Sequence, residues 1–264
     1  MSPTAILDAT PLWLLSLATI LVCLLSVEAG FRLGRWARGR SAPETEAPVG
    51  SMVGAVLGLL AFLLAFTFGM AGDRYAARRA LVLDEANAVG TAWLRAGLLP
   101  EPAGSEVRAM LREYVEVRLD AVLNDRVAAG IAESERLHQA LWAIAQSTGQ
   151  ANPGSELIPL FIDSLNEVID LHASRVTAGI RNRVPETIWI ALFLLAILAM
   201  APMGYHSGIT GSRRTAAVLP LTIAFSVVIV LIADLDTPQR GLLTVNQAAL
   251  QDVLTMMTRQ GGGQ

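Results

Sequence analysis

Four uncharged, apolar runs divide the chain into alternating membrane-like and polar stretches. They cover residues 9–27, 49–72, 187–205 and 215–233. Each run is close to the roughly 20 residues that a helix needs to cross about 30 Å of hydrocarbon. Nowhere does the chain show the two-residue alternation of a half-buried strand. The pattern therefore predicts an all-α integral membrane protein with four transmembrane helices.

The polar stretch between the second and third runs has its own helical pattern. Apolar residues recur there at steps of three and four, with charged residues on the other side: Val107, Met110, Leu111, Tyr114, Val117 and Val122, then Leu137, Leu141 and Ile144, then Leu157, Phe161, Leu165 and Val168. We therefore expect spans one and two in 1–72, a helical extramembrane domain in 73–186, spans three and four in 187–235, and a tail with a short helix in 236–264.

The second run passes from Gly72 into Asp73 without a helix breaker, which predicts one helix that starts in lipid and continues into water. At about 100° per residue, this helix has two unlike sides. We expect the bulky side to face lipid; it carries Val53, Val56, Leu57, Leu60 and Leu64. We expect the smaller side to pack in a helix bundle or to line a space, and we take it as the candidate pore-lining face; it carries Ser51, Ala55, Gly58, Phe62, Phe66, Gly69 and Asp73.

Gly50, Gly54 and Gly58 also form a row at four-residue spacing on this helix. Such rows let two membrane helices approach closely, so helix packing is the first interpretation of these glycines. Steps of four drift by about 40° each on a helix of 3.6 residues per turn. The glycine row and Phe66 therefore serve different contacts.

Composition agrees with a membrane protein and excludes several functions. Hydrophobic residues make up 53% of the chain, and the mean hydropathy is +0.49. All 20 basic residues are arginine, which excludes a Walker A lysine and a Schiff base. The formal net charge of −3 argues against a nucleic-acid partner. Because Cys23 is the only cysteine, we expect no disulfide and no cysteine metal site, and nothing indicates a cofactor.

Candidate catalytic groups are scattered. His138, His172 and His206 are isolated in the sequence, and we expect them to be surface or capping groups. Asp84 and Glu85 lie just beyond the second run, where a solvated or intersubunit hydrogen-bonding role is expected. The chain is therefore predicted not to be an enzyme. An intramembrane hydrolase stays a distant alternative, which needs a buried nucleophile and base.

Asp234 and Asp236 end the fourth run, where acids must be solvated or paired. Arg240 is a natural partner for either one, and an interfacial cap and turn is the other interpretation. The arginines of loop 30–48 favour a cytoplasmic side for that loop, and thus an external helical domain. Arginines on the domain side are about as numerous, so the rule favours this orientation only slightly.

Several segments resemble a bestrophin-like family of bacterial membrane proteins. These are Leu64-Ala65-Phe66, Asp73-Arg74-Tyr75, Arg78, residues 85–91, Leu94-Arg95, residues 28–35 and residues 234–241. The resemblance implies the fold of bestrophin ion channels, in which the second membrane helix lines the neck of a pentamer. It places Phe66, Phe62 and Gly58 at that neck. It also implies a cytoplasmic helical domain, which is the opposite of the orientation that the arginine distribution favours.

This chain departs from the bestrophin pattern in two places. Thr67, Phe68, Gly69 and Met70 replace the polar residues that follow the neck phenylalanine, and only Asp234 and Asp236 remain of the acidic calcium clasp. We therefore predict no calcium gating. The function predicted from these patterns is an inner-membrane homo-oligomer, a pentamer, that conducts inorganic ions through a hydrophobic constriction. The alternative is a non-conducting scaffold or sensor in the lipid bilayer whose helical domain binds a partner.

Overall fold

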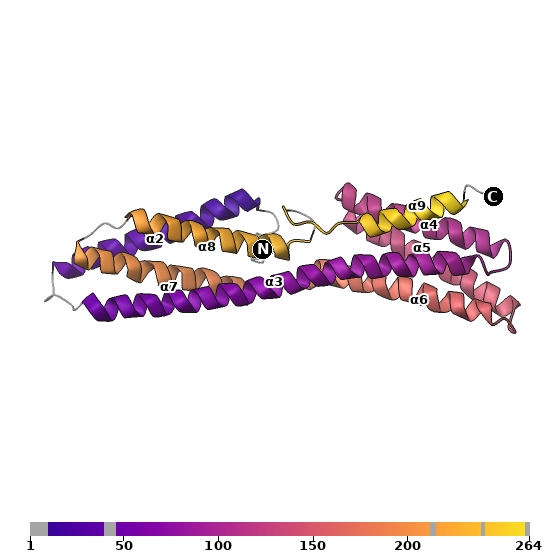
Figure 1. The fold of residues 1–264 in the computed structure, drawn as a ribbon, viewed down its shortest axis with the longest axis horizontal. Coiled ribbons are helices and arrows are strands. Elements are labelled where there is room, and N and C mark those ends of the chain that lie inside the picture. Colours follow the sequence, from indigo (N-terminus) through magenta and orange to yellow (C-terminus); the bar gives the residue numbers. More distant parts are fainter. Residues whose placement is uncertain (1–9, 40–45, 212–214, 239–240, 262–264) are drawn as a thin grey trace. The chain divides into compact units, whose positions relative to one another are not determined.

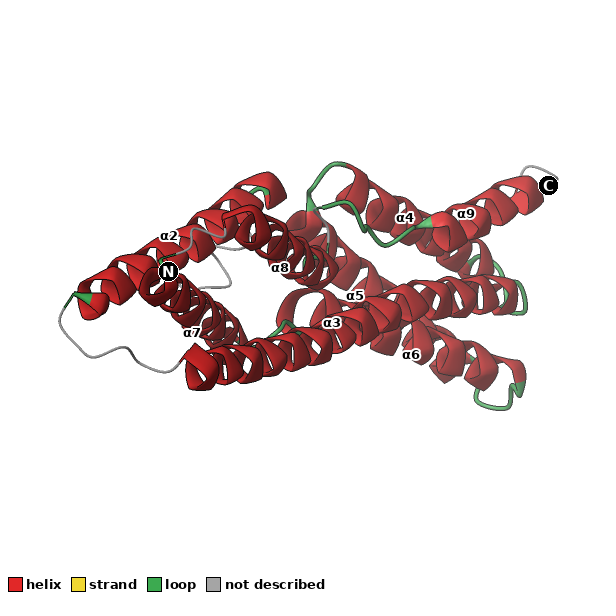
Figure 2. Cartoon of the chain, turned by 60° about the vertical axis from the view of Figure 1, so that its left-hand side comes forward, coloured by secondary structure: helices red, strands yellow, loops and turns green. Residues whose placement is uncertain are grey.

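The computed structural model describes residues 10–39, 46–211, 215–238 and 241–261, and all regular structure within them is helical (Figure 1). The α-helices are α2 (Leu12–Arg38), α3 (Glu46–Ala96), α4 (Ala103–Leu123), α5 (Val127–Ala151), α6 (Leu157–Val176), α7 (Glu186–Thr210), α8 (Thr215–Asp236) and α9 (Ala248–Gly261). A π-helical turn, η1 (Thr177–Arg181), follows α6. Figure 2 shows in green the short loops that join α3 to α4, α4 to α5 and α5 to α6.

The chain divides into two compact units, which we describe separately. The membrane unit holds the described residues of 1–74 and 183–243, and the helical unit holds those of 75–182 and 244–264. Within the described residues, four helices are long and apolar enough to cross a membrane, which confirms the four predicted spans. Helix α3 runs unbroken from Glu46 to Ala96, so the predicted continuation beyond the second apolar run is also confirmed.

Helix α2 has the features of a membrane span. Trp13 and Trp36, near its two ends, are 68% and 62% exposed. At 1.5 Å per residue they lie about 35 Å apart along the axis, close to the thickness of the hydrocarbon core. Tryptophans collect at the two membrane interfaces because one end of the ring is apolar and the other is polar. Between them the helix exposes Leu14, Leu17, Leu21, Leu25 and Leu33, as a lipid-facing surface does.

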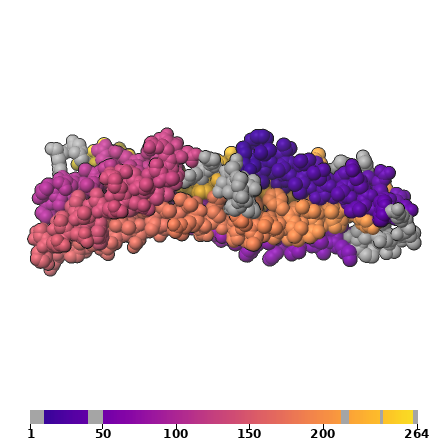
Figure 3. Space-filling view, turned by 180° about the vertical axis from the view of Figure 1, so that it is seen from behind, coloured from indigo at the N-terminus to yellow at the C-terminus, as the bar shows by residue number. Residues whose placement is uncertain are grey.

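Helices α2 and α7 pack closely through glycines of both helices: Gly30, Gly34, Gly204 and Gly208. In the space-filling view, α2 in indigo lies directly on α7 in orange (Figure 3). A Cβ added at Gly30 would lie 2.8 Å from the carbonyl carbon of Ala201, and one at Gly204 would lie 2.8 Å from that of Val27. This reciprocal contact is the small-residue packing that lets membrane helices approach backbone to backbone.

A polar contact joins α2 to α8 inside the membrane unit. The Ser16 and Ser226 hydroxyl oxygens are 3.0 Å apart, and the Ser226 hydroxyl donates to the Ser16 carbonyl at 3.1 Å. In hydrocarbon, serine hydroxyls find partners on neighbouring helices because no water competes for them. This pair fixes the register of the two helices.

The helical unit has its own hydrophobic core. Its fully buried side chains come from the second part of α3 and from α4, α5, α6 and α9, and include Val89, Leu111, Leu141, Phe161 and Leu250. The 3- and 4-residue spacing of these positions places them on one face of each helix. The unit is therefore a packed helical domain, as the sequence pattern predicts.

Candidate functional site

The side of α3 predicted to line a pore is exposed along the whole membrane segment. All seven predicted residues are exposed: Ser51, Ala55, Gly58, Phe62, Phe66, Gly69 and Asp73. Phe62 and Phe66, one turn apart, are 69% and 58% exposed. No other described part of the chain covers this face, so a second molecule, lipid or a water-filled path must lie against it.

The predicted lipid-facing role of the opposite side is wrong. Leu60 and Leu64 are 0% and 3% exposed, so they are buried within the chain. Val53, Val56 and Leu57 are partly buried. The reason is that bulky aliphatic side chains fill the space between helices of one subunit as readily as they face lipid, since both surroundings are apolar.

The exposed face of α3 differs from those of the other spans. In the described parts of α7 and α8, the large hydrophobic side chains that are exposed are all branched aliphatic ones: Ile190, Leu194, Ile197 and Leu198 on α7, and Leu219, Ile223, Val227 and Leu231 on α8. On α3, small residues alternate with Phe62 and Phe66, with Met52, Leu59 and Phe68 beside them. Small side chains gain little from lipid but permit close contact or leave room for a path.

The glycine row of α3 does not pack against another helix among the described residues. A Cβ added at Gly50, Gly54 or Gly58 would meet nothing within 4 Å. Close packing of this row within the subunit is therefore wrong, and α2 and α7 contain the glycines that serve that purpose. Contact between the row and a second copy of the chain stays a prediction.

Asp234 and Asp236 are buried at the end of α8, with 1% and 2% exposure. The two carboxylate oxygens of Asp234 accept the Leu242 and Leu243 backbone N–H groups at 2.8 and 3.1 Å. These bonds form a turn like the predicted cap. A Cβ at Gly241 would lie 3.0 Å from the Asp234 side-chain carbon, and Gly241 has a φ of +131°. This turn therefore requires glycine.

Asp236 has a different partner from the predicted one. Its carboxylate accepts Arg183 Nε at 3.1 Å and the Val184 N–H at 2.9 Å. The predicted partner, Arg240, lies outside the described residues. Since both acids already accept donors of the chain itself, they act as structural connectors here. The absence of calcium gating stays a prediction.

A buried polar cluster lies between the helices of the helical unit. Its members come from α3, α4, α5, α6 and the segment before α9: Glu85, Tyr114, Arg118, His138, His172, Arg175 and Gln247. The Glu85 carboxylate is completely buried. It accepts the Tyr114 hydroxyl and Arg175, and Arg118 Nε lies 3.4 Å from it. Arg175 also donates to the Gln247 side-chain oxygen at 3.1 Å.

The hydrogen bonds of Tyr114 fix the proton positions of His172. The hydroxyl has one proton, which it donates to Glu85, and its oxygen lies 3.2 Å from His172 Nδ1. His172 Nδ1 must therefore carry a proton and donate to Tyr114, since a neutral imidazole has one donor and one acceptor nitrogen. The second ring nitrogen, Nε2, is then an acceptor. It is buried and has no hydrogen-bond partner among the described residues.

His138 completes the cluster from α5. Its ring centre lies 4.9 Å from that of His172, edge to face, and 5.0 Å from that of Tyr114. His138 Nε2 is likewise buried without a hydrogen-bond partner in the part of the chain that the structure describes. We call His138 and His172 the histidine pair. The expectation of isolated surface histidines is wrong for both, because tertiary packing joins residues that are far apart in the sequence.

Burial and charge shift the ionisation of this cluster. Burial lowers the pKa of both members of the histidine pair to about 4, and the charge of Arg118 acts in the same direction. Burial alone would raise the pKa of Glu85, but Arg118, Arg175 and the Tyr114 hydrogen bond more than offset this and hold it below its usual value. The cluster thus contains an ionised glutamate, two cationic arginines and two neutral histidines.

Glu85 therefore differs from its neighbour. Asp84 and Asn87 are exposed, as expected for residues in water. Glu85 faces the opposite way, into the core, so its predicted solvated or intersubunit role is wrong. The physical reason is the helical period, which turns adjacent residues about 100° apart.

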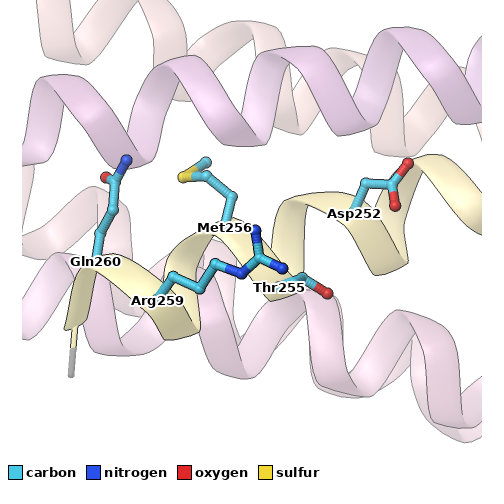
Figure 4. A pocket seen from close by; sticks show the side chains of 5 residues that line it. All are labelled: Asp252, Thr255, Met256, Arg259 and Gln260. Atoms are coloured by element: carbon cyan, nitrogen blue, oxygen red, sulfur yellow. The ribbon is translucent and has the colours of Figure 1, made fainter.

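Neither the pocket along α9 nor the acidic side chains of the described residues provide a ligand site. One open pocket of about 450 Å³ lies along α9 and is lined by Asp252, Thr255, Met256, Arg259 and Gln260 (Figure 4). These side chains all come from one helix and do not converge on a point. Among the residues with described positions, no three His, Cys, Asp or Glu side chains form a group that could hold a metal ion.

Known proteins match the chain over most of its length. Residues 17–250 match the family described as Bestrophin-like domain. A crystal structure of a bacterial bestrophin homologue from Klebsiella pneumoniae aligns with a TM-score of 0.66 at 13% identity, covering 96% of this chain and 99% of that one. A variant of that homologue gives 0.66 at 14% identity, covering 96% and 100%. No curated protein matches significantly. At these identities the structures show a shared fold.

Proposed function

Since this chain belongs to the Bestrophin-like family, we propose that it is a homo-oligomeric ion channel, a pentamer, in the inner membrane of the cell. The exposed face of α3, from Ser51 to Asp73, lines the path in this proposal. Five copies of that face around one axis enclose a space that a single chain cannot form. The permeants are inorganic ions, and the protein acts as a channel rather than an enzyme.

The observation that carries this proposal is the composition of the exposed α3 face. Its small residues are unlike the leucine and isoleucine surfaces of α7 and α8, which suit lipid. A face of Ser51, Ala55, Gly58 and Gly69 leaves room at the axis of a ring. Phe62 and Phe66 are the widest side chains on it, so they narrow the space most.

The mechanism follows from the chemistry of those two rings of phenylalanine. A narrow apolar constriction expels water, and an ion then loses its hydration without gaining polar partners. Rings of Phe62 and Phe66 would therefore close the path in the resting state. A rotation or tilt of α3 that moves the phenylalanines off the axis would rehydrate the constriction and permit flow.

The test is ion flux through purified protein in vesicles, with the variant Phe62→Ala/Phe66→Ala. Loss of the two rings should raise the leak at least several-fold over the wild-type protein. The matched control is Leu194→Ala/Leu198→Ala, which also shortens two exposed apolar side chains one turn apart, on α7. This control should leave flux unchanged. Equal flux in all three proteins would remove Phe62 and Phe66 from the path.

The second candidate is the scaffold or sensor. Leu157 and Leu160, which lie three residues apart at the start of α6, are each 46% exposed and could contribute to a docking surface for a partner. In that case, substitutions on the α3 face should affect neither flux nor function. Flux that responds to Phe62 and Phe66 would exclude this candidate.

A further inference from the structure

Burial lowers the pKa of both rings of the histidine pair; the charge of Arg118 acts in the same direction and that of Glu85 in the opposite one. The pair faces Glu85 from α3, Tyr114 and Arg118 from α4, and Arg175 from α6. Gln247, ahead of α9, contributes only a neutral amide. One carboxylate and two guanidinium groups already leave the cluster with an excess positive charge. Each additional imidazolium would increase that excess inside the core.

The proton positions lead to the same conclusion. Nδ1 of His172 already donates to Tyr114, so an added proton must sit on Nε2. That nitrogen is buried and has no hydrogen-bond partner among the described residues, and the His172 ring lies edge to face with that of His138, with 4.9 Å between the ring centres. A charged donor in such a place has no acceptor, which is the most costly arrangement for a buried polar group.

Besides its apolar contacts in the core, helix α3 is bound to the rest of the helical unit through this cluster. Glu85 is its completely buried acid, and Tyr114 and Arg175 reach it from α4 and α6. A disturbance of these contacts frees the carboxylate of α3 from both helices at once. The unit then lowers its free energy by opening and solvating the imidazolium groups.

From this geometry we propose that the cluster is a proton-operated latch, which holds the second part of α3 against α4 and α6 when the histidine pair is neutral and releases it when the pair is charged. The latch is a regulatory device of the helical unit. It does not depend on ion conduction, and its test uses only the conformation of that unit. Failure of the latch and failure of the channel proposal are therefore separate results.

Linkage sets the expected size of the effect. The pKa of each histidine is about 4 in the latched state and about 6.5 in a released, solvated state. Between these values, the released-to-latched ratio should rise about tenfold for each histidine with every unit by which the pH falls. Two histidines acting together give about a hundredfold per pH unit. Above about pH 7, the ratio should not depend on pH through this pair.

The experiment uses the full-length protein in lipid nanodiscs with isotope-labelled histidine. The chain has only three histidines, so the imidazole signals are assigned with three single variants: His138→Gln, His172→Asn and His206→Gln. Amide hydrogen exchange of residues 82–96 is followed over the same pH range and corrected for the intrinsic effect of pH. In the wild-type protein, we expect His172 to carry its proton on Nδ1 at neutral pH. Protonation of the pair should coincide with faster exchange in 82–96.

The double variant His138→Gln/His172→Asn removes both titrating rings but keeps an amide donor near Tyr114. It should abolish the pH-dependent step in exchange, while His206→Gln, in α7, should keep it. An unchanged step in the double variant would overturn the proposal. If residues 82–96 of the double variant already exchange fast at neutral pH, the wild-type protein alone tests the proposal, by whether protonation of the histidine pair coincides with faster exchange in 82–96. Histidines that charge near pH 6.5 without any change in exchange would refute the latch.

Discussion

The glycine contact between α2 and α7 gives a prediction whose magnitude follows from the geometry. In Gly204→Ala, the new Cβ would lie 2.8 Å from the Val27 carbonyl carbon and closer still to its oxygen. Ordinary contacts of this kind begin at 3.4 Å, so the two backbones must separate by about 0.6 Å or more. The contacting atoms belong to the backbone, so no side chain can rotate away.

The loss of stability follows from that separation. A gap of 0.5 to 1 Å forfeits roughly a quarter to a half of the dispersion attraction across an interface. Overpacking of this kind costs about 1–3 kcal/mol. For a chain of this size, about 2 kcal/mol corresponds to a decrease of roughly 4–8 °C in unfolding temperature. The assay is thermal unfolding of the purified protein in one detergent, followed by tryptophan fluorescence.

The matched control is Gly72→Ala in α3, which belongs to neither the glycine row nor the predicted pore-lining face. A Cβ there meets nothing within 4 Å among the described residues, so the unfolding temperature should not fall. The reasoning is refuted if Gly204→Ala unfolds within about 1 °C of the wild-type protein, given the expected shift. It is also refuted if both variants lose the same stability, since the effect would then belong to any glycine of a membrane helix.

Three further predictions concern buried charge. Arg183→Ala should lower the unfolding free energy by about 3–5 kcal/mol, because it leaves the buried Asp236 carboxylate without its charged partner. Asp236→Asn should lower it by less. Denaturant unfolding of both variants checks this order. Gly241→Ala should destabilise the turn that follows α8 because the Cβ meets Asp234, and faster proteolysis of that turn would reveal it. Through the histidine pair, the unfolding free energy of the wild-type protein should not change with pH above about pH 7. It should fall by about 1.4 kcal/mol per pH unit for each histidine as the pH drops from 6.5 toward 4, because the lowered pKa means that the fold favours the neutral ring. Unfolding curves at several pH values test this, and a profile without a decrease contradicts it.

The sequence alone allowed prediction of the helices but not of all their neighbours. Membrane spans and helical periods are local signals, so the four spans and the long α3 helix could be predicted. The side of α3 that packs against the rest of its own chain could not be predicted. Leu60 and Leu64 satisfy their apolar character equally in lipid and between helices, and hydropathy does not separate the two.

Contacts between distant segments were also hidden. The histidine pair is joined only by tertiary packing of α5 on α6, which no local pattern reveals. A partial signal was present, since Arg118 follows Tyr114 by one turn on an apolar helix face, and Arg175 follows His172 by three residues. Charged residues that continue a buried face indicate an internal polar cluster, because isolated charges are rarely buried.

The mass of the purified, detergent-solubilised particle, corrected for bound detergent, tests the central claim most directly. A ring of five 28.1 kDa subunits has a mass of about 140 kDa. Such a particle would give the exposed α3 face an axis to line and Phe62 and Phe66 a path to close. A monomer or a dimer would contradict the account, because neither forms an axial path along that face.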